Sequence, residues 1–123
     1  MKIRIKGNSL RLRLSKTAIS QLKQKGIVSQ QISFGGNMLT YQLKIDKAIT
    51  QVQADYINNV ISVNIPNELA AKWTDTEMVG FDEEVKYGNG QSISVLVEKD
   101  FQCLTAREGE DETDLFTNPQ MIE

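Results

Sequence analysis

The chain has 123 residues, a net charge of −2 and a hydrophobic fraction of 40%, which predicts one soluble globular domain. It contains no histidine and a single cysteine, Cys103, which excludes Ser-His and Cys-His nucleophilic pairs, histidine metal sites and an internal disulfide. No apolar run approaches the ~20 residues of a membrane span, and the charged, alternating N-terminus lacks the apolar core of a signal peptide, so we expect a cytoplasmic protein.

The charges are unevenly distributed along the chain. Residues 1–45 contain nine Lys or Arg and no acid, whereas residues 46–123 contain five Lys or Arg and all sixteen acids. Two interpretations stay open. The two halves face and neutralise each other, or the basic half binds an anionic partner.

The first fourteen residues, MKIRIKGNSLRLRL, predict a β-hairpin whose two-residue loop is Gly7-Asn8, a type II′ signal. Its register puts apolar residues on one face and Lys or Arg on the other, in the pairs Ile3–Leu12, Ile5–Leu10, Lys2–Arg13 and Arg4–Arg11. Like charges directly opposite each other cost up to about 1 kcal/mol. We therefore expect an anionic group over this face, either the chain's own acids or a ligand.

Two short helices are predicted. Residues 16–25 follow Ser15, a good N-cap, and end at Gly26, the usual C-terminal stop. Residues 66–73 begin with a proline, which suits a first helical turn, and they place Trp73 on the buried side as a core anchor.

Between these helices, apolar and polar residues alternate, which predicts four strands in an antiparallel meander. The predicted turns are Gly36-Asn37, residues 46–49 and Asn58-Asn59, the last a type I′ loop because Asn tolerates positive φ. The resulting registers pair Phe34 with Leu39, Leu43 with Val52, and Ala54 with Val63.

A last hairpin runs over residues 79–97 around the three-residue loop 88–90. Glu83 breaks its alternation, since this residue falls on the apolar side opposite Val95. Either a bulge turns Glu83 outward or its carboxylate lies near the core. The register also pairs Val85 with Ile93 and Phe81 with Val97.

Together these elements predict an α+β fold in the order ββα-ββββ-α-ββ. We expect about eight mostly antiparallel strands in a curved sheet or a small barrel, with two short helices. Residues 1–104 form the predicted domain, and residues 105–123 form an acidic tail that is partly ordered or disordered.

The polar face of the sheet is the first candidate site. Its predicted anion-binding residues are Lys2, Arg4, Lys6, Arg11, Arg13 and Lys44. Arginine suits phosphate because it offers bidentate hydrogen bonds and a fixed charge. As an alternative, Asp82, Glu84 and Glu98 hold Mg²⁺ beside these residues. That pattern is similar to triphosphate-tunnel enzymes, although the opening K-I-R-I-K stands where such enzymes have E-x-E-x-K.

The acidic end of the chain is the second candidate, either as a cation site or as a segment that folds back on the basic face. Its residues are Glu98, Asp100, Cys103, Glu108, Glu110, Asp111, Glu112 and Asp114. Their spacing does not match an EF-hand, and one cysteine without histidine is a poor zinc site. Nucleic acid is the least favoured partner, because no stacking aromatic residue lies among the basic charges.

Several segments resemble a family of short bacterial proteins of unknown function. They are the opening MKIRIKGNSLRLRLSK, then ISFG, the stretch IPNELAAKW and the segment LVEKDFQCL. The resemblance implies a stand-alone domain and brings no known activity.

Two functional hypotheses result. In the first, the chain is a small cytoplasmic binding or interaction module that uses the basic sheet face, without a cofactor, for a small anionic or phosphorylated ligand or for its own tail. In the second, it is a Mg²⁺-assisted phosphohydrolase. The residues leave open whether the protein is an enzyme.

Overall fold

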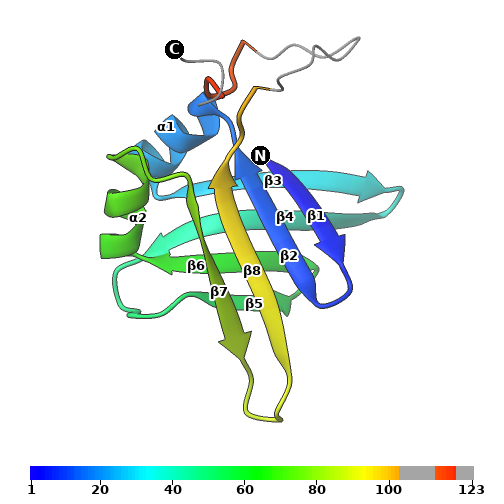
Figure 1. The fold of residues 1–123 in the computed structure, drawn as a ribbon. Helices are drawn as coiled ribbons and strands as arrows, with labels where there is room; N and C mark the ends of the chain where they lie inside the picture. The colour runs from blue at the N-terminus through cyan, green and yellow to red at the C-terminus, as the bar shows by residue number, and fades with distance from the viewer. Residues whose placement is uncertain (103–112, 119–123) are drawn as a thin grey trace.

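The computed structural model describes residues 1–102 and 113–118, which form two four-stranded sheets and two helices (Figure 1). Sheet A has the strand order β1-β2-β8-β7, and sheet B has the order β3-β4-β6-β5. The strands of sheet A are β1 (Lys2–Lys6), β2 (Ser9–Leu14), β7 (Gly80–Lys86) and β8 (Ser92–Lys99). Those of sheet B are β3 (Ile27–Phe34), β4 (Asn37–Asp46), β5 (Gln53–Ile57) and β6 (Val60–Pro66), and the helices are α1 (Lys16–Lys25) and α2 (Asn67–Thr74).

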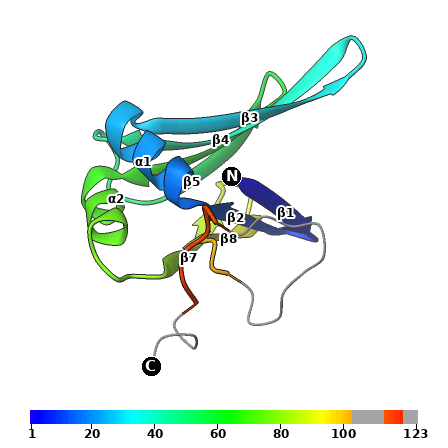
Figure 2. The ribbon, with the colours of Figure 1, turned by 90° about the horizontal axis from the view of Figure 1, so that it is seen from above.

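Both sheets have the same plan. Each joins two antiparallel hairpins through a central parallel pair, β2 with β8 in sheet A and β4 with β6 in sheet B. The strands of the two sheets cross at a steep angle in Figure 1, and Figure 2 shows both helices at the same end of the two layers. Among residues 1–102 and 113–118, no helix lies at the opposite ends of the sheets.

The hydrophobic core lies between the inner faces of the sheets and against the helices. Trp73 of α2 is fully buried; its Nε1–H donates to the Val79 carbonyl at 3.0 Å, and its ring meets the Phe81 ring edge-on at 5.6 Å. Burying one aliphatic side chain contributes about 1.5–3 kcal/mol. The central strands supply most such residues, namely Leu10, Leu12, Leu14, Leu43, Val63, Ile65, Val95 and Val97.

The first hairpin and the first helix form as the sequence predicts. The first hairpin has the predicted pairs, including Arg4 opposite Arg11, and Gly7 turns the chain with a φ of 55°. Ser15 caps α1 by accepting a hydrogen bond from the Ala18 N–H at 3.3 Å. Gly26 ends that helix in the left-handed conformation, with a φ of 75°.

The predicted closed or single curved sheet is wrong, because the strands form two open mixed sheets and no barrel in the described part of the chain. The predicted meander is also wrong. β4 pairs with β6 in parallel, so Leu43 lies opposite Val63, and β5 becomes an edge strand. Residues 47–52 connect β4 to β5, which lies on the far side of β6. The predicted meander and the observed strand order put the same alternate side chains on the inner face, so the alternation does not distinguish them.

Two smaller predictions need correction. The β3–β4 loop is Gly35-Gly36, so Phe34 pairs with Asn37 and not with Leu39. α2 begins one residue later than predicted, at Asn67.

Glu83 is neither in a bulge nor buried. The β7–β8 register is continuous through the Glu83–Val95 pair, and Glu83 is exposed. Its position in an edge strand gives the carboxylate access to solvent although it shares the inner face.

Part of the predicted tail packs on the domain. Leu115 is buried, and Phe116 bridges to Phe101 in parallel, with ring centroids 5.9 Å apart. The domain boundary at residue 104 stays a prediction, because residues 103–112 and 119–123 lie outside the described residues. Neither described helix is long and apolar enough to cross a membrane, and the cytoplasmic location also stays a prediction.

Candidate functional site

Five of the six predicted anion-binding residues share the outer face of sheet A. Ile3 of β1 and the leucines of β2 point to the core, so the alternate residues point outward. We call this set the basic face, and it consists of Lys2, Arg4, Lys6, Arg11 and Arg13. The sixth residue, Lys44, lies on the outer face of sheet B, because its neighbour Leu43 is buried on the inner face.

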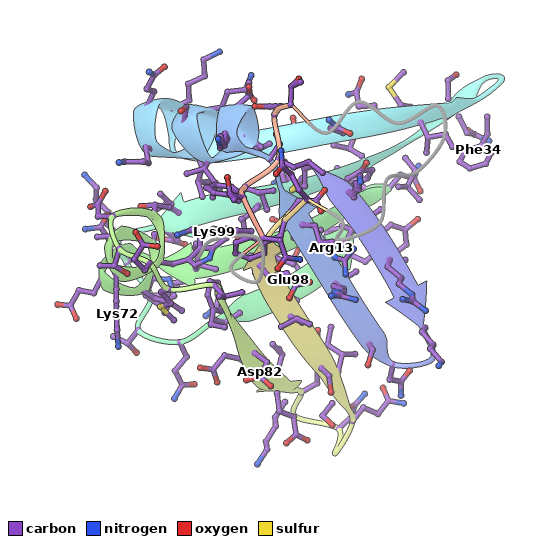
Figure 3. The ribbon with its side chains drawn as sticks, turned by 45° about the horizontal axis from the view of Figure 1, so that its top comes forward. Arg13, Phe34, Lys72, Asp82, Glu98 and Lys99 are labelled. Atoms are coloured by element: carbon purple, nitrogen blue, oxygen red, sulfur yellow. The ribbon has the colours of Figure 1, made fainter. Side chains whose placement is uncertain are left out.

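Glu98 of β8 neutralises part of the basic face. Its Oε1 accepts hydrogen bonds from the Arg11 Nε–H at 2.7 Å and from the Arg13 Nε–H at 3.0 Å. A second Arg11 nitrogen, Nη2, donates to the same oxygen. Figure 3 shows Arg13 beside Glu98. One carboxylate therefore holds two guanidinium groups side by side and lowers their mutual repulsion.

A second acid pairs with the start of β1. The Lys2 Nζ lies 3.1 Å from the Asp100 Oδ2, and Asp100 is buried whereas Lys2 is exposed. The two acids in and after β8 thus pair with three of the five members of the basic face, and their two negative charges offset two of its five positive charges.

Arg4 and Lys6 are exposed and have no ion-pair partner within residues 1–102 and 113–118. Two hollows, of about 280 Å³ and about 300 Å³, are both lined by Arg4 and Arg11. Lys6 also lines the first hollow, and Lys2 and Arg13 also line the second. Positive charge that the described residues do not neutralise is therefore concentrated where the surface is concave.

The alternative metal site, Asp82, Glu84 and Glu98, stays a prediction. Asp82 and Glu84 lie on β7, on the same outer face, but Glu98 is occupied by the two arginines. No group of three or more His, Cys, Asp or Glu side chains in the described part of the chain could hold a metal ion. The described residues also form no tunnel of the triphosphate-tunnel kind, because the sheets stay open.

The second candidate site is the acidic end of the chain, and the structure describes only Glu98, Asp100 and Asp114 of it. Asp114 accepts hydrogen bonds from the Thr17 N–H at 3.1 Å and the Thr17 hydroxyl at 2.8 Å, at the first turn of α1. The Thr17 hydroxyl, above all, lowers the pKa of Asp114. Asp114 is thus a partner of α1 and not of the basic face, while Cys103, Glu108, Glu110, Asp111 and Glu112 lie outside the described residues.

The sequence did not predict an open cleft of about 500 Å³ between the two sheets. It lies where the β1–β2, β5–β6 and β7–β8 hairpins meet, and the Tyr87 hydroxyl donates across it to the Ala54 carbonyl at 2.7 Å. Burial raises the pKa of Tyr87, and the nearby Asp55 charge adds to this. No sequence motif marks this cleft, since its lining comes from three separate hairpins. The apolar lining residues include Ile5, Leu10, Tyr56, Ile61 and Ile93.

The fold and the site define a small α+β protein of two open mixed sheets, with a partly neutralised basic face on one of them. The chain belongs to a family of unknown function, DUF7009, whose model matches residues 1–120. No curated protein and no solved structure matches the chain.

Proposed function

We propose that the chain is a binding module that holds a small anionic or phosphorylated ligand on the basic face. The environment of the Arg4 side chain is the main support for this proposal. This side chain lines both hollows of the basic face, and neither it nor Lys6 has an ion-pair partner in the described part of the chain.

The arrangement of Arg11 supports the same function. Its Nε and one terminal nitrogen donate to Glu98, which fixes the guanidinium plane next to the hollows. A guanidinium has five N–H donors in a rigid fork, so further donors stay available to a ligand. A ligand with several anionic oxygens would bridge Arg4 and Arg11 and relieve the like-charge contact between them.

The second hypothesis, a metal-assisted phosphohydrolase, has less support. It needed a barrel lumen and a cluster of free carboxylates, and the described residues provide neither. A binding role needs only the charge and shape of the basic face.

Isothermal titration calorimetry with inorganic tripolyphosphate tests the proposal. The wild-type chain should bind tripolyphosphate, and the affinity should fall as salt is added, because exposed charges are screened. The double variant Arg4→Gln with Lys6→Gln should lose at least ten-fold in affinity, about 1.4 kcal/mol. Its matched control, Lys44→Gln with Lys47→Gln, removes the same charge from exposed residues outside the basic face and should bind like the wild type. Absence of binding by the wild type, or equal binding by both variants, would contradict the proposal.

A further inference from the structure

The charges on the outer face of sheet A follow the rows of residues that lie opposite one another across the strands. The row through Arg4 continues through Arg11 and Leu96 to Asp82. The row through Lys6 continues through Ser9 and Ser94 to Glu84. Each row therefore begins with a base on β1 and ends with an acid on β7.

β1 and β7 are the two edges of sheet A, on opposite sides in Figure 1. Within the described residues, β1 pairs only with β2, and β7 pairs only with β8. Both edge strands run antiparallel to the central parallel pair, so they run in the same direction as each other. An edge strand presents unpaired N–H and C=O groups that another strand can use.

We propose that β1 of one copy of this chain pairs in parallel with β7 of a second copy and extends sheet A across both molecules. Continuing the rows without a shift places Asp82 of one copy beside Arg4 of the other, and Glu84 beside Lys6. The inference rests on the proposed function, because it uses Arg4 and Lys6, which have no ion-pair partner among the described residues, and identifies a second copy as their anionic partner.

The charges favour this unlike pairing over the two like pairings. Two β1 strands would bring Arg4 and Lys6 of both copies together, and two β7 strands would bring Asp82 and Glu84 together. Opposite charges on neighbouring strands stabilise a sheet, and like charges destabilise it. On the inner face, the same register sets Ile3 beside Phe81 and Ile5 beside Glu83. Only the first of these two pairs, Ile3 with Phe81, is an apolar contact. The specificity of the pairing would therefore come from the charges on the outer face of sheet A.

A contact between two different edges can repeat, since each added copy leaves one β1 and one β7 free. The twist of about −20 to −25° between neighbouring strands would make such a series of sheets coil. The expected behaviour is a mass that rises with protein concentration at low salt and falls when salt is added.

Sedimentation velocity on charge-reversed variants tests the inference. Arg4→Glu with Lys6→Glu makes both edges acidic, and Asp82→Lys with Glu84→Lys makes both edges basic. Each variant alone should stay monomeric, because it has no complementary edges. Their equimolar mixture should associate, and so should the variant that carries all four changes.

The control Lys44→Glu with Lys47→Glu should associate like the wild type, because it leaves both edges of sheet A unchanged. Far-ultraviolet circular dichroism checks that the variants, all at exposed positions, are folded.

A wild-type chain that stays monomeric at low salt and high concentration would overturn the inference, and its edge charges would then act only to prevent strand pairing. Association that persists in both charge-reversed variants would overturn it as well. The calorimetric experiment separates this failure from failure of the proposed function. A monomeric wild type that still binds tripolyphosphate through Arg4 and Lys6 keeps the proposed function and removes the second copy as the partner.

Discussion

Glu98 determines how the basic face is arranged. It is half-buried, and its Oε1 accepts from both Arg11 and Arg13, which lie on the neighbouring strand. The sequence predicted like charges opposite each other on this face and an anionic group over them, either the chain's own acids or a ligand. The alternation could not identify which acid, because β2 and β8 are far apart in the chain and their parallel register is not encoded locally.

Replacing Glu98 with Gln should destabilise the protein and strengthen anion binding. The two guanidinium groups would lose their charged acceptor, so we expect the free energy of unfolding to fall by about 1–3 kcal/mol. The same change leaves more positive charge at the hollows, so tripolyphosphate should bind more tightly. Urea unfolding and calorimetry measure the two effects. A variant with unchanged stability and weaker binding would contradict the role given to Glu98.

Asp114 gives the first turn of α1 a pH dependence. Hydrogen bonding to Thr17 lowers the pKa of Asp114 in the folded state. Its stabilising contribution is therefore complete above the unfolded pKa of about 3.9 and is lost as the pH falls through the lower folded pKa. Asp114→Ala should be less stable than the wild type at neutral pH, and the two should converge in acid. Urea unfolding at a series of pH values checks this, and a difference that grows in acid would contradict it.

Hairpins and helices are the elements that could be predicted from the sequence. Their signals are local: Ser15 and Gly26 bound α1, and Asn58-Asn59 turns the β5–β6 hairpin with φ values of 52° and 63°. The parallel pair of sheet B could not be predicted, because Leu43 of β4 suits an apolar partner equally well whether that partner is Val52, as predicted, or Val63 of β6, as observed. The intersheet cleft depends on those pairings, so it was missed for the same reason.

Gly80, at the start of β7, is required by its close approach to β8. A Cβ atom at this position would lie 2.3 Å from the Val97 carbonyl oxygen and 2.7 Å from the Glu98 Cβ. Gly80→Ala should therefore lower the free energy of unfolding by about 1–3 kcal/mol, because main-chain atoms would have to move. Gly88→Ala, in the loop of the same hairpin, is the matched control, since its Cβ would have no neighbour within 4 Å. Equal stability of the two variants in urea unfolding would refute this interpretation.

Different surfaces of the molecule form the core and carry the charge. The inner faces of both sheets and the two helices form the core, so the outer face of sheet A is free to carry charge. Across that face the charge runs from basic at β1, through the neutralising Glu98 on β8, to acidic at β7, where Figure 3 shows Asp82. The unequal charge of the two halves of the sequence thus appears as a gradient of charge across one sheet, and the described acids neutralise only part of its basic edge.

The proposed function places an anionic group at Arg4, Lys6 and Arg11. Its most direct test is a nuclear magnetic resonance titration of the labelled wild-type chain with inorganic tripolyphosphate, which follows the backbone amides and the arginine side-chain Nε–H signals. We expect the largest shifts at the Arg4 and Arg11 side chains and along β1 and β2, with little change on the outer face of sheet B around Lys44. Shifts that are absent, or that centre on Lys44 or on the intersheet cleft, would contradict the proposed function.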